Sequence, residues 1–564
     1  MLRNFFFTNH RLFYLIVFSF FLHVIAAYFS QGYYEQDEHF SILEPIMFKL
    51  GEEATLGWDF FLYYDKQWFL SFTFFYIIQF LQLFGIDNPF QWAFIIRLVS
   101  SILGWISIIC LIHFTKKQLG NEKNINTLIL ISTLFWFYPF IHARAASESI
   151  SISFLIIAIT LFTFFYKNKK TLLFCGVCLG LAFVTRYTNI VIILSFGIWA
   201  LIFRKVNFIN SLILITSFCF VYVASIFIDY WGYGTLFPGE KGLVAYNYFY
   251  WNQVWHGMYY FGRHTDYWWY NFYLIITEFF PPISIIILIC ILIFWIRNPL
   301  NIITWITLPY FVFLSINPFK ETRFLFPILM ISPFFVLMVL SDFYLHGKDL
   351  LKNILSYKIL KFFTYLLVVI NCLALLILSM LPANSSIPLF KFLYSNEFEI
   401  KKIYTIDKIP YRKSDLLINF YRNKDIYFTK ITDREECDKI GNERGKEIEV
   451  AEEVNLYSNY SGNEIEVSQD EIPILEIQKY SKPNWIYKYS IQCNKNLFFE
   501  NFKLDKTKYF LIHKFSYYDF FAKNQEYNCN IIFSTFPKWL LNKNTKKILK
   551  NLPSWHLFEC RVNI

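Results

Sequence analysis

Two adjacent carboxylates, Asp37 and Glu38, directly follow the first long apolar stretch of the sequence. Acidic side chains at a membrane boundary are costly to desolvate and are often functional. A carboxylate beside an acceptor hydroxyl can act as a general base, and it can also stabilise an oxocarbenium-like transition state. We therefore predict that Asp37 is a base and that Glu38 supports it or binds the acceptor. The alternative is an ordinary solvated acidic loop.

Two cations, Lys320 and Arg323, lie in a short connection between two later apolar segments. Cations at a membrane boundary suit a phosphate or pyrophosphate leaving group. The competing interpretation is that both long side chains snorkel to the interface. No residues have metal-ligand spacing, and if the leaving group is a single phosphate the two cations can replace a divalent metal, so we expect neither a required metal nor a cofactor.

Further polar side chains accompany these two groups. The stretch 230–270 is rich in Tyr and Trp, which suits stacking on a sugar ring, although an interfacial aromatic belt explains the same composition. Arg144 and Glu148 stand four positions apart, so they can pair across one helical turn. Arg186 stands at the end of another apolar segment.

The elements that must position these residues are membrane helices. The chain has 564 residues, of which 56% are hydrophobic, and its repeated apolar runs have the length of transmembrane helices. The net charge of +10 comes from short basic clusters between these runs, so it does not indicate nucleic acid as a partner. We predict about eleven spans. They are 12–30, 91–113, 125–142, 149–166, 171–186, 188–203, 207–229, 271–296, 300–317, 324–341 and 359–382.

The composition changes near residue 382. Residues 1–382 are predicted to form an all-α polytopic membrane domain, and residues 383–564 a mixed α/β extramembrane domain. Four cysteines of this second region, Cys437, Cys493, Cys529 and Cys560, allow disulfides if it faces an oxidising compartment.

The basic clusters also predict the topology. With a cytoplasmic N-terminus, every cluster of Lys and Arg between the spans falls on the cytoplasmic side if 67–84 is an amphipathic helix on the outer face. If 67–84 spans instead, the clusters fall outside. The predicted outer connections are 31–90, the turn 143–147, the turn at Tyr187, 230–270 and 318–323, together with the C-terminal region, and they carry the candidate catalytic residues.

Short motifs occur in a fixed order along the membrane part of the sequence. They lie at 35–40, 56–60, 144–148, 186–188, 229–234, 246–247, 261–270 and 320–327. Together they resemble glycosyltransferase family 22, the lipid-linked mannosyltransferases of the C superfamily of glycosyltransferases. This family includes the GPI-anchor and N-glycan mannosyltransferases of the endoplasmic reticulum and bacterial relatives. The spacing from Asp37 to Gly51 is more similar to the bacterial relatives.

The resemblance implies a C-type glycosyltransferase fold with a lumenal or periplasmic active site. It implies a polyprenyl- or dolichyl-phosphate mannose donor, a glycan or glycolipid acceptor, and an α-mannoside product formed with inversion. The membrane would be that of the endoplasmic reticulum in a eukaryote or the inner membrane in a bacterium. Lys320 and Arg323 would bind the donor phosphate. The implied contacts to acceptor and sugar are Glu44, Trp58, Arg144, Arg186, Asn247, His264 and Trp268.

Other functional classes predict different sequences. A transporter of lipid-linked glycans should carry polar residues deep in several spans, and often internal repeats. A polysaccharide polymerase or ligase should rely on Arg and His in a large outer loop without an early Asp-Glu pair. A non-catalytic scaffold is the third alternative. The gathering of polar residues on one predicted face favours a transferase.

Overall fold

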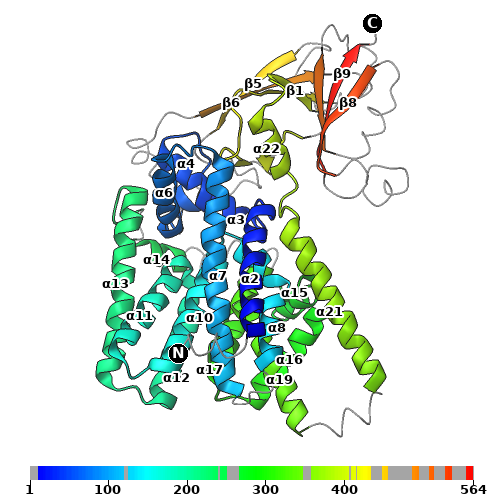
Figure 1. The fold of residues 1–564 in the computed structure, drawn as a ribbon. Helices are drawn as coiled ribbons and strands as arrows, with labels where there is room; N and C mark the ends of the chain where they lie inside the picture. Colours follow the sequence, from blue (N-terminus) through cyan, green and yellow to red (C-terminus); the bar gives the residue numbers. More distant parts are fainter. Residues whose placement is uncertain are drawn as a thin grey trace. The chain divides into compact units, whose positions relative to one another are not determined.

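The computed structural model describes residues 10–61, 63–119, 125–238, 242–250, 266–346, 357–405, 408–413, 416–432, 447–454, 485–493, 507–513, 527–536 and 554–562. The chain divides into two compact units. The first comprises Met1–Glu38, Leu62–Ile86 and Trp92–Leu381. The second comprises His39–Phe61, Asp87–Gln91 and Pro382–Ile564. The first is built of helices, whereas the second contains the β-strands (Figure 1).

The first unit is a bundle of apolar helices, several of which begin at an asparagine cap. Asn168, Asn207 and Asn301 each accept backbone N–H groups at the start of the helix that follows. The longer helices are α2 (His10–Phe29), α6 (Phe69–Gln82), α7 (Pro89–Leu119, which begins in the second unit), α8 (Ile125–Leu134), α10 (Ser147–Phe165), α11 (Lys169–Thr185), α12 (Ile190–Arg204), α13 (Phe208–Tyr233), α16 (Ile283–Arg297), α17 (Ile302–Ile316), α19 (Ser332–His346) and α21 (Tyr357–Met380).

Short helices connect or interrupt the longer ones. Three predicted spans are broken in this way. The predicted span 125–142 contains α8 and a separate α9, the predicted span 271–296 contains α15 and α16, and the predicted span 324–341 contains α18 and α19. Proline lacks the N–H that a helix interior requires, which accounts for the second break at Pro281 and Pro282. These short elements are α3 (Gln36–Glu38), α9 (Phe137–His142), η3 (Tyr187–Asn189), α14 (Val244–Asn247), α15 (Tyr270–Glu278), η5 (Thr322–Leu325) and α18 (Phe326–Leu329).

By length and composition, four helical segments of the described chain are long and apolar enough to cross a membrane. They are α7, α10, the segment Tyr187–Arg204 and α13. The number rises to six if each of two bent helix pairs is one span. The predicted count of about eleven therefore stays a prediction. Helix α6, in the segment expected to lie on the outer face, is shorter than these spans, and its place relative to the membrane is also still a prediction.

The second unit is built around a mixed sheet with the strand order β5-β6-β4-β1-β7-β9-β8. Strand β1 (Lys402–Thr405) pairs in parallel with β4 (Tyr427–Thr432) and with β7 (Lys508–Ile512), and β6 (Trp485–Cys493) pairs in parallel with β4. The outer strands are antiparallel: β5 (Glu447–Val454), β8 (Tyr527–Ser534) and β9 (His556–Val562). A disulfide joins Cys529 of β8 to Cys560 of β9.

Helices and a small ribbon complete this unit. They are η1 (His39–Leu43, a π-helix), α4 (Glu44–Leu50), α5 (Trp58–Phe61), α22 (Ile387–Ser395), β2 (Arg412–Lys413) and β3 (Leu416–Leu417). The second unit thus combines the region after residue 382 with segments of the predicted first outer loop. The described part of this region is a sheet with a helix, in keeping with the mixed α/β composition expected for it.

Candidate functional site

Six charged side chains from distant parts of the sequence meet in the first unit, and we call this group the charged cluster. Asp37 follows α2, Glu148 lies in the first turn of α10, and Arg323 lies in η5. Each sits where a long apolar helix gives way to a short element, so the cluster gathers at helix ends. Its members are Asp37, Lys66, Glu148, Arg186, Glu321 and Arg323.

Arg323 is the centre of the cluster. Its Nη1 lies 2.8 Å from Oδ2 of Asp37, and its Nε lies 3.7 Å from Oε1 of Glu148. The same Nε donates a hydrogen bond to Glu321. Lys66 approaches the shared Asp37 oxygen to 3.5 Å. One guanidinium therefore joins three carboxylates: one in α3, one in α10 and one in the residue that precedes η5.

Arg186 is the second arginine of the cluster. Its Nη1 lies 2.8 Å from Oε1 of Glu148, the oxygen that also faces Arg323. Both guanidinium groups lie over the ring of Phe324, at 5.0 Å for Arg186 and 5.4 Å for Arg323. Glu148 is nearly buried, and cation–π contacts add to the ion pairs. Two positive charges are thereby held in fixed positions beside one another.

The electrostatics of Asp37 suit a carboxylate that stays ionised. Desolvation disfavours its charge, but the neighbouring Lys66 and Arg323 outweigh this and hold its pKa well below the usual range. The side chain still exposes 42% of its surface. Both ion pairs use Oδ2, and among the described residues Oδ1 has no hydrogen-bond partner. One carboxylate oxygen is thus open to an incoming group.

Glu38 has a different environment from its neighbour Asp37. Its Oε1 accepts the backbone N–H groups of Tyr34 and Glu35, at 3.0 and 3.3 Å. Burial raises its pKa to about 7, even though Arg144 and the two N–H groups act in the opposite direction. This carboxylate therefore stabilises the turn that presents Asp37, and it makes no ion pair with the cluster in the part of the chain that the structure describes.

Lys320 and Arg323, which we predicted to act together on the donor phosphate, have different partners in the structure. The ammonium of Lys320 donates to the carbonyls of Asn317 and Asp266, at 2.6 and 3.1 Å. Its backbone N–H donates to the Asp266 carboxylate at 3.1 Å. Lys320 is only 6% exposed, and burial lowers its pKa. Its role as a phosphate ligand stays a prediction, whereas Arg186 occupies the place beside Arg323.

Arg144 and Glu148, whose spacing allows a pair across one helical turn, have other partners in the structure, and a sugar contact by Arg144 stays a prediction. Arg144 donates to the carbonyl of Gly32 at 2.7 Å, and also to the carbonyl and hydroxyl of Ser30. The reason is local, because Ala146 is extended and α10 begins only at Ser147. The two residues therefore do not share a helical turn. Arg144 ties the start of the first loop to α9 instead.

The other predicted sugar contacts are not members of the charged cluster, or they fall outside the described residues. Asn247 is buried and donates to the carbonyls of Pro238 and Gly242 in its own loop, and at 3.4 Å to the carbonyl of Tyr64, two residues before Lys66. Trp268 is 67% exposed and lines an apolar cavity of about 740 Å³. Glu44 lies in the second unit and is described below. The side chain of Trp58 and the whole of His264 fall outside the described residues.

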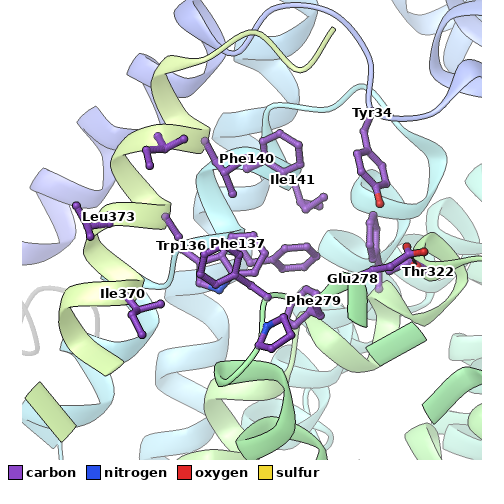
Figure 2. Close-up of a pocket in the computed structure, with 16 residues that line it drawn as sticks. Tyr34, Trp136, Phe137, Phe140, Ile141, Glu278, Phe279, Thr322, Ile370 and Leu373 are labelled. Carbon is purple, nitrogen blue, oxygen red and sulfur yellow. Dashed lines mark hydrogen bonds between the residues drawn. The ribbon is translucent and has the colours of Figure 1, made fainter. Parts of the chain in front are cut away.

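A second apolar cavity, of about 620 Å³, has one polar end (Figure 2). Tyr34, Glu278 and Thr322 lie together at that end, and apolar residues of α21 such as Ile370 and Leu373 lie at the other. The Thr322 hydroxyl donates to Glu278. Burial and the nearby acids raise the pKa of Tyr34 to about 12, so its phenol remains a donor at neutral pH. Because Thr322 precedes Arg323 in η5, this polar end adjoins the charged cluster.

Several residues of this site were not predicted as site residues. Lys66 had a detectable signal, since it is one of two lysines in an acidic loop. Glu148 was considered only as a partner of Arg144. Tyr34 and Glu278 carried no sequence signal. Within the described ranges, no group of three or more His, Cys, Asp or Glu is placed to hold a metal ion. Independence from metal remains a prediction.

The fold defines a class of protein. The structure is similar to ArnT from Cupriavidus metallidurans bound to undecaprenyl phosphate, with a TM-score of 0.50, 10% identity and coverage of 98% of each chain. It also matches the oligosaccharyltransferase of Archaeoglobus fulgidus, with a TM-score of 0.42, 12% identity and coverage of 72% of this chain and 63% of that one. No curated protein sequence matches the chain. The likeness to ArnT supports a C-type membrane glycosyltransferase fold.

The sequence identifies the family within this class. The profile of the Alg9-like mannosyltransferase family matches residues 13–412, which is most of the chain. The chain belongs to the Alg9-like mannosyltransferase family. It is therefore a glycosyltransferase and a multi-pass membrane protein, and the resemblance drawn from the sequence motifs is confirmed.

Proposed function

We propose that this protein transfers mannose from a polyprenyl- or dolichyl-phosphate mannose to a hydroxyl of a glycan or glycolipid. The reaction inverts the donor configuration and gives an α-mannoside. One observation carries the proposal: the Asp37 carboxylate and the Arg323 guanidinium, which come from positions 286 apart in the sequence, lie 2.8 Å apart. Such a transfer needs a proton acceptor and a phosphate ligand within one site, on opposite faces of the same sugar ring.

The residues have distinct roles in this reaction. The acceptor oxygen forms a bond to C1 of mannose on the face opposite the phosphate, while the bond from C1 to the phosphate oxygen breaks. The hydroxyl proton passes to Asp37, whose Oδ1 is open. The departing lipid phosphate gains negative charge, which Arg323 and Arg186 stabilise from fixed positions. Lys320 stays a candidate third ligand of the phosphate.

Donor binding changes the ion pairs of the cluster. A phosphate that accepts hydrogen bonds from Arg323 competes with Asp37 and Glu321 for the same guanidinium. Asp37 is then released to the acceptor hydroxyl. The ion pairs with Glu148, Asp37 and Glu321 therefore keep the guanidinium groups of Arg186 and Arg323 ordered until the phosphate arrives.

The apolar cavity beside Thr322 is our proposed site for the lipid of the donor. Its wall is apolar along α21, and its polar end adjoins Arg323, as a prenyl chain with a phosphate head requires. The solved ArnT structure with undecaprenyl phosphate supports a lipid carrier for this fold class.

The test is a donor assay with the full chain in lipid nanodiscs. Undecaprenyl-phosphate mannose, dolichyl-phosphate mannose and GDP-mannose are supplied separately with a lipid extract of the source membranes as acceptor. We expect labelled product from a lipid-phosphate donor, and we expect the label to be released by an α-mannosidase. Product from GDP-mannose alone would overturn the proposed donor.

We further propose that residues 383–564 face the same outer compartment as Asp37. The Cys529–Cys560 disulfide supports this, because disulfides persist in oxidising compartments. Single cysteines placed near Glu53 and Lys430 should be labelled by an impermeant reagent from outside, and one near Lys169 should not. Labelling of the Lys430 position only after the membrane is opened would contradict this topology.

A further inference from the structure

Two of the sequence motifs have no part in the reaction above, and both bind the same stretch of backbone. The first motif is the carboxyl-terminal turn of α13, at 229–234, and the second contains Asn247 of α14. The stretch that they bind is 64–68, which leads into α6 and carries Lys66 of the charged cluster. All of these residues, and Asp37 as well, belong to the first unit.

Side chains at the end of α13 bind this backbone directly. The Tyr233 hydroxyl donates to the carbonyl of Lys66 at 2.7 Å. The buried carboxylate of Asp229 accepts the backbone N–H of Trp68 at 2.9 Å. A buried carboxylate that loses a hydrogen-bond donor is destabilised, so the second of these bonds is costly to break. The backbone of Lys66 is therefore held independently of its own side chain.

The stretch approaches α13 so closely that position 232 requires glycine. A Cβ atom added to Gly232 would lie 2.1 Å from the Trp68 ring. That ring is 1% exposed, and it packs edge-on against Trp231 and Tyr233, with ring centres 5.9 and 5.7 Å away. Tyr64, at the other end of the stretch, has a left-handed backbone with a φ of 50°, which a residue other than glycine keeps only when its surroundings hold it. The whole stretch is thus fixed against α13.

Lys66 reaches Asp37 from this fixed backbone. Its ammonium lies 3.5 Å from Oδ2 of Asp37, the oxygen that Arg323 also binds. In the proposed reaction the donor phosphate draws Arg323 away, whereas Lys66 can keep Oδ2 occupied while Oδ1 faces the acceptor. Desolvation raises the pKa of Asp37 and both cations lower it, so Lys66 opposes this desolvation after Arg323 has turned to the phosphate.

We infer that the carboxyl-terminal turn of α13 positions Lys66, the cation that stays with Asp37 when the donor phosphate binds Arg323. This inference rests on the proposed function, since it takes Asp37 as the base and Arg323 as a phosphate ligand. It gives the motif at 229–234 a role in transfer, with Asp229, Gly232 and Tyr233 as positioning residues. A misplacement of about 1 Å at a reacting group can reduce a rate by roughly 100-fold, so the place of Lys66 matters for catalysis.

The first test measures structure and needs no substrate. Gly232→Ala places one methyl group against the Trp68 ring. The matched control is Gly197→Ala, because Gly197 also lies inside a long helix, α12, and no atom of the described chain lies within 4 Å of its added Cβ. In nanodiscs, hydrogen exchange of the peptide 63–70 should rise roughly tenfold or more in Gly232→Ala and stay unchanged in Gly197→Ala. Unchanged exchange at 63–70, or an equal rise across the whole first unit, would overturn the inference.

Tyr233→Phe is a milder variant, since it removes one hydrogen bond and keeps the ring. Tyr138→Phe is its control, because the Tyr138 hydroxyl also donates to a backbone carbonyl, that of Met330, at 2.7 Å. Exchange at 63–70 should rise roughly 3–10-fold in Tyr233→Phe and stay unchanged in Tyr138→Phe. Equal exchange of this peptide in the two variants would overturn the inference, even if Gly232→Ala fails to fold.

The second test measures transfer from undecaprenyl-phosphate mannose at several pH values. Gly232→Ala should lower kcat by roughly 10–100-fold with little change in the donor KM. The acid limb of kcat should move to higher pH, because the pKa of Asp37 rises when Lys66 is displaced, so the loss is largest at acid pH. An equal loss at every pH would indicate only a smaller folded fraction and would overturn the inference. A donor KM that rises more than tenfold would also overturn it, since Lys66 would then bind the phosphate.

Lys66→Met shows whether the effect of α13 passes through Lys66. This variant should shift the acid limb of kcat in the same direction, and Gly232→Ala added to it should shift the limb no further. A further shift in the double variant would mean that α13 acts on Asp37 by another route, which would overturn the inference. The charged groups that face Asp37 are Lys66, Arg186, Arg323, Glu35, Glu148 and Glu321.

The two tests separate this inference from the proposed function. If Asp37→Asn transfers normally, the proposed base is wrong, and hydrogen exchange alone decides whether α13 holds the stretch 64–68. If Asp37→Asn is inactive but Gly232→Ala keeps both its exchange and its pH profile, only the positioning role fails.

Discussion

Two carboxylates on one helical run, Asp37 and Glu44, have opposite surroundings. Asp37 is 42% exposed, pairs with the side chains of Arg323 and Lys66, and keeps one oxygen open. Glu44 is fully buried and is bound mainly by backbone N–H groups. Side-chain cations can move away when a substrate arrives, whereas backbone amides inside a packed unit cannot. Sequence position alone does not separate an acid with an open oxygen from an acid enclosed by the backbone.

The cations show the same contrast within one motif. Arg323 pairs with side-chain carboxylates, which a phosphate can replace. Lys320 donates to backbone carbonyls, which fix the connection around it. The same rule holds for the two acids and for the two cations. A charge paired with side chains can exchange its partner for a substrate, whereas a charge bound by the backbone stays in place.

The largest expected effect is that of Asp37→Asn. The amide keeps the shape of the side chain but cannot accept the proton, so transfer should fall by roughly 10²–10⁴-fold. The measurement is the initial rate of transfer in nanodiscs. Glu52→Gln serves as the control for removal of an acid, and both variants should unfold near the wild-type temperature. A near-normal rate for Asp37→Asn would remove this residue from the mechanism.

Replacement of Arg323 comes next. Arg323→Ala should reduce kcat by about 10²–10³-fold because it removes a fixed donor to the leaving phosphate. Arg323→Lys should recover only part of this, since lysine lacks the planar fork that spans two acceptors. Arg297→Ala is the control, because Arg297 pairs with Asp342 and is about half exposed. Full activity of Arg323→Lys would show that charge alone suffices.

Lys320→Met tests the contrast between the two cations directly. If Lys320 mainly fixes its connection, the variant should lose about 1–3 kcal/mol of stability while the folded enzyme keeps its donor KM. Thermal unfolding and the donor KM separate these effects. A donor KM that rises more than tenfold in a stable variant would instead support the original prediction that Lys320 binds the phosphate.

Glu38→Gln should have the smallest effect, and that effect should depend on pH. Because burial raises the pKa of Glu38 to about 7, its carboxyl is mostly neutral below that pH and ionises as the pH rises through it. Glutamine copies the neutral form. The rates of variant and wild type should therefore agree near pH 6 and diverge by less than about tenfold near pH 8. A constant ratio from pH 6 to pH 8 would contradict this assignment.

Part of the fold and site could be predicted from the sequence. The length of the apolar segments predicted the helical membrane part. The negative charge of Asp37 and the positive charge of Arg323 indicated a base and a phosphate ligand. The pairing of Arg186 with Glu148 could not be predicted, because it depends on how α10 and α11 pack. The break at Ala146 separates Arg144 from Glu148 despite their helical spacing. The burial of Glu44 could not be inferred either, because an acidic loop gives no sign of which acid is enclosed, and its sugar contact stays a prediction.

The link between Cys529 and Cys560 has a practical consequence for handling the protein. It closes a loop with a sequence separation of 31 residues, which in a chain-entropy account is worth about 4 kcal/mol. A single protease cut anywhere between the two cysteines leaves both fragments attached, and they separate on a gel only after reduction. Samples purified in strong reductant would lose this restraint on β8 and β9, so assays with and without reductant would compare two different molecules.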